Sequence, residues 1–209
     1  MTKVDEVKKS IGCMRVVFSD GQTVRVPFAL FADFRVRAGE PIDPDGYQRL
    51  LADHAYPYAL DRAAKLLAVK DMTEKNIYDK LISIGYPEAV VARVMQTLER
   101  YEFVSDARFS GHFVESRGKR YGRNRLMREL QARGVDGETA REALDALDPA
   151  DERAAALSQA RKLSARKDLN DPADRQKITA ALVRRGYGWG LIKDVLNELR
   201  SEAEKGNEA

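Results

Sequence analysis

The chain of 209 residues is 44% hydrophobic and 33% charged with a formal net charge of +3, so it can bury the core of one elongated domain or of two small ones. Its single cysteine, Cys13, excludes an intrachain disulfide and fits a reducing compartment. No apolar run is long enough to span a bilayer or to act as a secretion signal, so a cytoplasmic protein is expected.

The first predicted element is a β-hairpin over residues 13–27, within an N-terminal extension that covers residues 1–42. Apolar and polar side chains alternate on both sides of Asp20-Gly21, a pair that supplies the positive φ angles of a tight two-residue turn. Because a hairpin alone is marginally stable in water, it should pack against the rest of the chain through Phe28, Phe31 and Phe34.

Helical periodicity begins at Asp43. This residue is a good N-cap, and Pro44 suits the first helical position. From here on apolar residues recur at spacings of three and four, and the strand signals disappear. The rest of the chain is therefore predicted to be helical.

A pattern of about 50 residues occurs three times in this helical part. The windows 79–101, 128–150 and 180–202 align without a gap, and their shared glycines are 49 and 52 residues apart. Each window has a leucine four residues before the glycine, an apolar residue directly after it, and a leucine thirteen residues beyond it. These positions are Leu81, Gly85, Tyr86 and Leu98; Leu130, Gly134, Val135 and Leu147; and Leu182, Gly186, Tyr187 and Leu199.

The shared glycine is typical of a helix C-cap, where a left-handed residue closes one helix before the next begins. A further helical stretch precedes each window, so the repeating unit is three helices. The predicted fold is mostly α: three tandem three-helix repeats forming an elongated curved rod, after a small β-hairpin extension. The predicted divisions are residues 1–42 (extension), 43–106 (linking helix and repeat one), 107–150 (repeat two) and 151–209 (repeat three and C-terminal tail).

Repeats two and three each divide into a basic and an acidic part. Residues 107–134 contain eight basic side chains against two acidic ones, whereas residues 135–152 contain one against seven. Residues 153–185 contain nine against three, and residues 186–209 contain three against five. The first two helices of both repeats should therefore form a positive strip, and the third helices a negative one.

A positive strip suits a repetitive polyanion or an acidic groove in a polymeric protein. The alternative is that charge-rich helices are simply solvated and pair with their neighbours. Because the same division occurs twice, the binding interpretation is favoured. The candidate contacts to a protein partner or DNA are Arg117, Lys119, Arg120, Arg123, Arg125, Arg128, Arg133, Arg161, Lys162, Arg166, Lys167, Arg184 and Arg185.

The segment "FVSDARFSGHFVESRGKRYGRNRLMRELQARGV" (103–135) resembles the central pattern of the RecX family, regulators of the RecA recombinase. In that pattern an acidic turn precedes an aromatic-containing helix, which is followed by Arg, a basic stretch, Gly, and a helix ending in Glu-Leu-x-x-x-Gly and an apolar residue. These places are taken here by Asp106, Phe109, Phe113, Arg117, Gly122, Glu129, Leu130, Gly134 and Val135. The segments "LLAVKDMTEKNIYDKLISIGY" and "ITAALVRRGYGWGLIKDVLNEL" are similar to the family's first and third repeats.

The resemblance implies a monomeric, non-enzymatic regulator that lies in the groove of the RecA filament on single-stranded DNA. There it would restrain filament extension, strand exchange, ATPase and coprotease activity, and so act on homologous recombination, DNA repair and the SOS response. If the positive strip makes the contact, replacing both Arg123 and Arg125 by Glu should abolish filament binding and leave folding unchanged. The family usually has a small residue at Glu102 and an Arg-rich entry at 69–71, so basic contacts from repeat one are not expected.

Two other functions fit the sequence. Three-helix units with a basic second helix suit a helix-turn-helix DNA-binding protein or transcriptional regulator. Strong sequence-specific binding to duplex DNA would favour this function, whereas weak nonspecific DNA binding fits the RecA regulator. A helical scaffold for an unrelated partner is what the periodicity alone allows.

No cofactor, metal site or catalytic group is predicted. His54 and His112 lack flanking cysteines or acid clusters, and Cys13 is explained by burial. The stretch "GYGWG" (186–190) lacks the spacing of a nucleotide-binding loop and is interpreted as a turn, in which Trp189 is more often a core residue than an interface residue.

Overall fold

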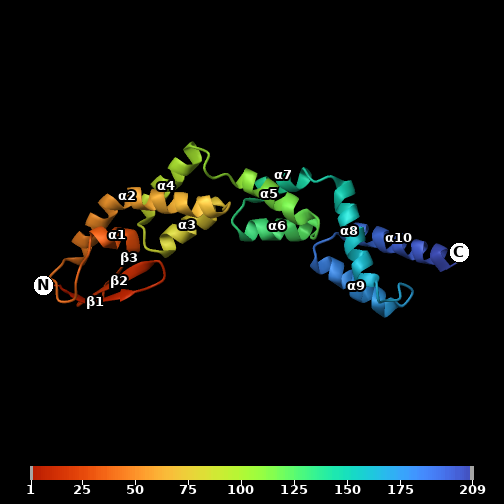
Figure 1. The fold of residues 1–209 in the computed structure, drawn as a ribbon, viewed down its shortest axis with the longest axis horizontal. Coiled ribbons are helices and arrows are strands. Elements are labelled where there is room, and N and C mark those ends of the chain that lie inside the picture. Colours follow the sequence, from red (N-terminus) through yellow and green to blue (C-terminus); the bar gives the residue numbers. More distant parts are fainter. Residues whose placement is uncertain (1, 208–209) are drawn as a thin grey trace. The chain divides into compact units, whose positions relative to one another are not determined.

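The computed structural model describes the backbone of residues 2–207 and the side chains of residues 2–203. It divides into two compact units, Met1–Ser105 and Asp106–Ala209 (Figure 1). The elements of the first unit are β1 (Val4–Lys9), β2 (Cys13–Phe18), β3 (Thr23–Pro27), α1 (Phe28–Asp33), α2 (Pro44–Val69), α3 (Glu74–Ser83) and α4 (Glu88–Arg100). Those of the second unit are α5 (Asp106–Gly118), α6 (Arg123–Ala132), α7 (Gly137–Asp145), α8 (Pro149–Ser164), α9 (Pro172–Arg184) and α10 (Trp189–Asn207).

The N-terminal extension is a three-stranded antiparallel sheet in the order β1-β2-β3. The predicted hairpin is confirmed, since β2 pairs with β3 from Val17↔Thr23 to Cys13↔Pro27. Its predicted two-residue turn is wrong: the Phe18 N–H donates to the Gln22 carbonyl across a three-residue loop, in which only Gly21 has a positive φ. Sequence analysis missed β1, which pairs with β2 from Val4↔Phe18 onward. The reason is that β1 is held mainly by backbone pairing and buries little beyond Val4, so its sequence lacks the apolar alternation of a strand.

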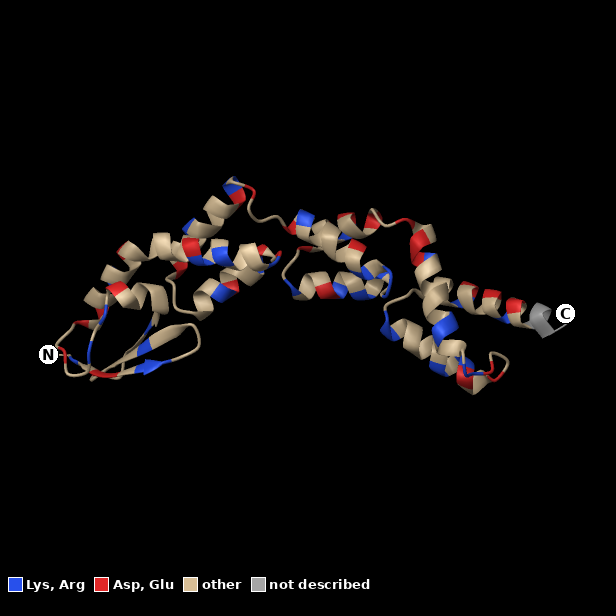
Figure 2. Cartoon of the chain, viewed as in Figure 1, with Lys and Arg blue, Asp and Glu red and all other residues tan. Residues whose placement is uncertain are grey.

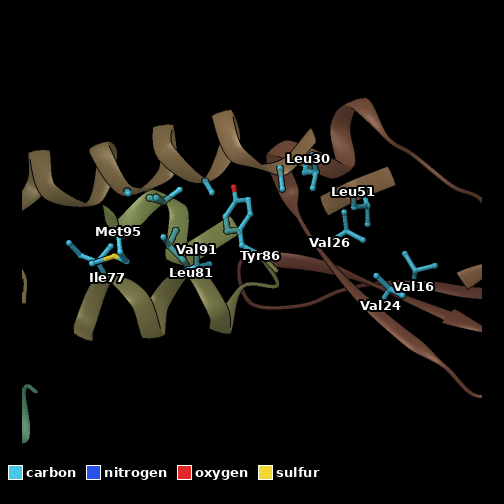
Figure 3. Close-up of a cluster of buried hydrophobic side chains, with 14 of the residues drawn as sticks. Val16, Val24, Val26, Leu30, Leu51, Ile77, Leu81, Tyr86, Val91 and Met95 are labelled. Atoms are coloured by element: carbon cyan, nitrogen blue, oxygen red, sulfur yellow. The ribbon is translucent and has the colours of Figure 1, made fainter. Parts of the chain in front are cut away.

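The first unit has one continuous core between the sheet, α2 and the α3–α4 pair (Figure 3). Val16, Val24 and Val26 extend from the strands, while Leu81 and Val91 fill the space between α3, α4 and α2. Of the three predicted packing phenylalanines, Phe31 and Phe34 contact this core, but Phe28 remains 40% exposed.

Local capping rules explain where α2 begins. The Asp43 side chain accepts a hydrogen bond from the Gly46 N–H at 2.8 Å, and Pro44 occupies the first turn, as predicted. The helix then continues through Pro57, so the predicted linking helix and the first helix of repeat one are a single element.

The second unit contains two three-helix groups, α5–α7 and α8–α10, each with its own apolar core. The shared glycines have the left-handed backbone that the repeat predicted, with φ of 104° at Gly85, 91° at Gly134 and 90° at Gly186. The residue limits assigned to the divisions remain predictions; the sheet and α2–α4 share one core within the first unit.

The two helix groups of the second unit are joined through their backbones. The N-cap residue of α6 is Gly122, which has no side chain to accept a hydrogen bond, and the Arg123 N–H donates to the Glu152 carboxylate of α8 at 3.1 Å. On either side of it, the Gly122 N–H donates to the Arg185 carbonyl at 2.9 Å and the Asn124 N–H to the Gly186 carbonyl at 3.1 Å. A Cβ atom at Gly122 would lie 2.6 Å from the Gly186 carbonyl carbon. Only glycine allows this approach, which fixes α6 against the α9–α10 turn.

No helix within residues 2–207 combines the length and the apolar character that crossing a membrane requires.

Candidate anion-binding site

Charge in the second unit is unevenly divided between the helices, but α5 and α8, which were predicted to belong to the positive strip, contain both acidic and basic residues. Figure 2 shows basic residues along α6 and α9 and acidic residues on α7 and α10.

A hollow opens where α6 meets α8 and α9, and we call it the junction hollow. Its volume is about 560 Å³, within the range of small-molecule sites. Five of its seven lining residues are cationic and none is acidic; the lining is Arg120, Tyr121, Arg125, Gln159, Lys162, Arg184 and Arg185. These residues come from both repeats of the unit, so the site depends on the fixed contact between α6 and the α9–α10 turn.

A second hollow adjoins the first along α6. It is lined by Arg125, Arg128, Glu129, Ala132, Arg133 and Arg184, and it shares Arg125 and Arg184 with the junction hollow. The two hollows together gather seven of the thirteen predicted contact residues onto one surface.

Glu129 organises the arginines of repeat two. Its carboxylate accepts hydrogen bonds at 2.9 Å from both Arg117 and Arg125, and Arg133 lies 3.7 Å away. The hydrogen bond from Arg125, together with the positive charges of Arg117 and Arg133, holds the pKa of Glu129 below its ordinary value. The glutamate is therefore charged at neutral pH, and it orients three guanidinium groups by ion pairing.

Aromatic rings orient the same guanidinium groups from their other sides. Arg125 lies 3.8 Å from the centre of the Tyr121 ring, and Arg117 and Arg133 lie 4.9 and 4.8 Å from that of Phe113. Such cation–π contacts limit the freedom of a long side chain and preserve its charge.

Among the five cations of the junction hollow, only Arg125 makes an ion pair with a described side chain; Arg185 is half-buried and donates to the Ala181 carbonyl. Arg120, Lys162 and Arg184 are exposed, and no carboxylate among the described side chains lies within ion-pair distance of them. Their charges are therefore available to a ligand.

The remaining predicted residues lie elsewhere. Arg123 points toward α7, where it donates to the Leu144 carbonyl at 2.7 Å and pairs with Asp145. Two others pair with acids of their own repeat, Arg161 with Glu202 and Lys167 with Asp174. Arg117 contacts Glu129 but lines neither hollow, and Lys119 and Arg166 are exposed outside both.

These positions correct one expectation from the sequence. Arg123 and Arg125 both make ion pairs within the unit, so replacing them by glutamate would create repulsion inside the fold as well as on its surface. The double variant is therefore a poor probe of binding, and Arg120, Lys162 and Arg184 are better choices.

Sequence analysis also missed members of the site. Tyr121 and Gln159 line the junction hollow, and neither was singled out. The tyrosine inside the run "KRYGRNR" was a usable signal, because an aromatic residue among arginines often supports cation–π contacts. Nothing in the sequence identified Gln159 as a lining residue, because its position in the hollow depends on how α8 packs against repeat two.

The acidic side chains form a hollow of their own. Glu115, Glu142, Asp148 and Asp151 surround an apolar floor between α5, α7 and the start of α8. The second unit therefore has an acid-lined hollow as well as the cationic junction hollow, although their charges nearly cancel in the net charge of the chain.

The other motifs have structural explanations. Cys13 is buried in β2, whereas His54 and His112 are exposed. Trp189 is 70% exposed at the start of α10, so the expectation that it packs in the core is wrong. Among the described residues no group of three or more potential metal ligands is found.

Tandem three-helix groups with a polar, cation-lined hollow between two of them define a helical-repeat protein. Sequence profiles of three domains match in order: "RecX, first three-helix domain" at residues 59–98, "RecX, second three-helix domain" at 105–144 and "RecX, third three-helix domain" at 151–196. The chain belongs to the RecX family.

Curated relatives agree along nearly the whole chain. The chain is 28% identical to "Regulatory protein RecX" of Clostridium tetani over 95% of its own length and 94% of the relative's. It is 34% identical to the protein of the same name from Mycolicibacterium smegmatis over 79% of its length and 93% of the relative's.

Solved structures share the fold. A crystal structure of regulatory protein RecX superposes with a TM-score of 0.63 at 21% identity, covering 93% of this chain and all of the other. RecX from Lactobacillus salivarius superposes with a TM-score of 0.64 at 20% identity, covering 69% and 96%.

Proposed function

We propose that this protein regulates the RecA recombinase by binding in the groove of the RecA filament on single-stranded DNA, without catalysis of its own. It acts there as a monomer in the cytoplasm and restrains filament extension, strand exchange, ATPase and coprotease activity. The observation that carries the proposal is the cationic surface formed jointly by repeats two and three, in a chain whose relatives are named regulatory proteins.

A filament presents the same groove many times along its length. A protein with repeated domains can make several weak contacts to it, and each contact raises the effective concentration of the next. Arginines held by Glu129 and Tyr121 lose little freedom when they bind, which lowers the entropic cost of each contact.

A helix-turn-helix protein that reads DNA bases is less well supported. Helix-turn-helix proteins place the N-terminal residues of the recognition helix against base edges in the major groove. In repeat two the N-terminal end of α6 contacts repeat three, because the Gly122 and Asn124 N–H groups donate to carbonyls of the α9–α10 turn. Sequence-specific binding through this helix would require the contact between the repeats to open.

The test is the ATPase activity of RecA on single-stranded DNA, titrated with the full chain at substoichiometric ratios. We expect inhibition by the natural protein and at least ~tenfold weaker inhibition by a variant with Arg120→Glu and Arg128→Glu, because charge reversal replaces two attractive contacts by repulsive ones. Both side chains are exposed and neither pairs with a carboxylate among the described residues, so the melting temperature should change little.

A matched control is the variant with Arg141→Glu and Arg175→Glu, which changes the same charge at exposed positions outside both hollows. It should inhibit like the natural protein. Absence of inhibition by the natural protein would refute the proposed function, and equal loss in both variants would show that only net charge matters.

A further inference from the structure

We propose that the junction hollow is a binding site for closely spaced phosphate groups. The proposal rests on the proposed function only for the reason why the chain would meet such groups, since a filament contains both a nucleic-acid strand and nucleotides. The site itself is argued from the side chains that line it.

The lining of the junction hollow is strongly positive. Five cationic side chains face one hollow with no acidic group in its lining, and Arg120, Lys162 and Arg184 have no carboxylate partner among the described side chains. Like charges that line one hollow repel one another, which lowers stability unless an anion lies between them. A single carboxylate would leave most of this charge uncompensated, whereas a row of phosphates would neutralise it.

The donor groups of the junction hollow suit phosphate oxygens. The guanidinium group of Arg125 is fixed between Tyr121 and Glu129, so its remaining N–H groups are oriented before a ligand arrives. Arginine presents a planar fork that matches two phosphate oxygens, and Lys162 adds a compact point charge. Gln159 contributes an amide beside these cations, which can donate to an oxygen as well.

The junction hollow continues into the second hollow along α6. The junction hollow shares Arg125 and Arg184 with the second hollow, where Arg128 and Arg133 follow along α6. A ligand with more than one phosphate can therefore extend from one hollow into the next. Both the backbone of a single strand and the phosphate chain of a free nucleotide have this property.

The site also depends on the contact between the repeats. Arg120, Tyr121 and Arg125 come from repeat two, whereas Lys162 and Arg184 come from repeat three. Because the Gly122 N–H and the Arg185 carbonyl join these repeats, a phosphate ligand should stabilise their junction.

The experiment measures phosphate binding by the full chain without RecA. The strand probe is a fluorescein-labelled oligothymidylate, followed by fluorescence anisotropy at several salt concentrations. The free-anion probes are inorganic tripolyphosphate and ATP, added as competitors. The variant is Lys162→Gln with Arg184→Gln, and the control is Arg141→Gln with Arg175→Gln, which removes two positive charges outside both hollows.

We expect the variant to bind the strand roughly tenfold more weakly than the control at one salt concentration, because each lost cation removes a charge-assisted contact. Its slope of log Kobs against log salt should be shallower by about 1.4, since each phosphate contact to a single strand contributes about 0.7. Circular dichroism should show the same helix content in both.

The competitors distinguish the source of the phosphates. If tripolyphosphate and ATP displace the strand from the natural protein but not from the variant, free anions and strand share the hollow. If neither competes and the variant still binds the strand more weakly than the control, the hollow is assigned to the strand backbone. Equal strand and competitor binding by variant and control overturns the proposal, and that result leaves RecA inhibition to be judged separately by the ATPase titration.

Discussion

At the scale of single residues, Glu129 has the largest influence on the candidate site. It accepts hydrogen bonds from Arg117 and Arg125, lies beside Arg133, and is 21% exposed, so its interactions are partly shielded from water. The same glutamate belongs to the Glu-Leu-x-x-x-Gly pattern of the sequence. The structure supplies a physical reason for a carboxylate at this place, namely to hold arginines of the positive surface in position.

Glu129→Gln should lower the free energy of unfolding by about 1–2 kcal/mol at pH 7, because three partly shielded charge contacts are lost. The pKa of Glu129 is lowered in the folded state from an ordinary value of 4.5. Its contribution is therefore complete above pH 4.5 and is lost as the pH falls through the folded-state pKa. Scanning calorimetry at pH 7, 5 and 4 measures this difference.

The control for this prediction is Glu115→Gln, which removes one exposed carboxylate of the same repeat. It should change stability by less than ~0.5 kcal/mol. A stability difference between natural protein and Glu129→Gln that persists undiminished below pH 4 would contradict the ion-pair explanation.

At the scale of secondary-structure elements, the turns between helices do more than connect them. Gly186 closes α9 with φ of 90° and lies directly against Arg125 at the start of α6. Its carbonyl oxygen also accepts the hydrogen bond from the Asn124 N–H. One glycine thus serves as a helix cap in repeat three and as a contact surface for repeat two.

Gly186→Ala should therefore destabilise the second unit by more than about 3 kcal/mol, since a methyl group adds both left-handed strain and a collision with the α6 backbone. Gly39→Ala is the matched control for strain, because Gly39 has φ of 85° and open space around its Cα; it should cost only about 1 kcal/mol. Gly122→Ala tests the collision without left-handed strain, because alanine readily adopts the φ of −79° found at Gly122.

The measurement is unfolding by urea, combined with hydrogen exchange of the Gly122 and Asn124 amides that join the repeats. We expect these amides to exchange faster in Gly186→Ala and Gly122→Ala and to be unchanged in Gly39→Ala. Equal destabilisation by Gly186→Ala and Gly39→Ala would show that the close contact contributes nothing.

At the scale of the whole molecule, the chain consists of two compact units with separate cores. The core of the first includes the sheet and α2–α4, whereas the second has one core per repeat. All residues of the junction hollow belong to the second unit. Phosphate binding is therefore expected to be a property of that unit alone.

A fragment of residues 106–209 should fold by itself and bind oligothymidylate within about threefold of the full chain, because it contains every residue of both hollows and complete cores. Far-UV circular dichroism and cooperative thermal unfolding measure the first property, and anisotropy the second. A fragment without cooperative unfolding would mean that the second unit depends on the first. RecA inhibition by the fragment should be weaker than by the full chain if repeat one adds contacts.

Features governed by local rules were predictable from the sequence. The C-cap glycines at Gly85, Gly134 and Gly186, the Asp43 cap and the pairing of β2 with β3 depend on the preferences of a few neighbouring residues. The division of charge between helices was also visible, because it follows from composition along the chain. The repeat itself identified the three-helix unit, and the resemblance led to the family.

Tertiary structure decided which charges face a ligand. Arg123 and Arg125 are two residues apart on α6, so they point to nearly opposite sides, one toward Asp145 and the other toward the hollow. The sequence alone determined that repeats two and three are rich in arginine and that glycines separate their helices. Only packing could determine that Arg120, Lys162 and Arg184 line one hollow with no carboxylate from the described side chains beside them, because the distances between side chains of different repeats depend on the contact between the α9–α10 turn and α6.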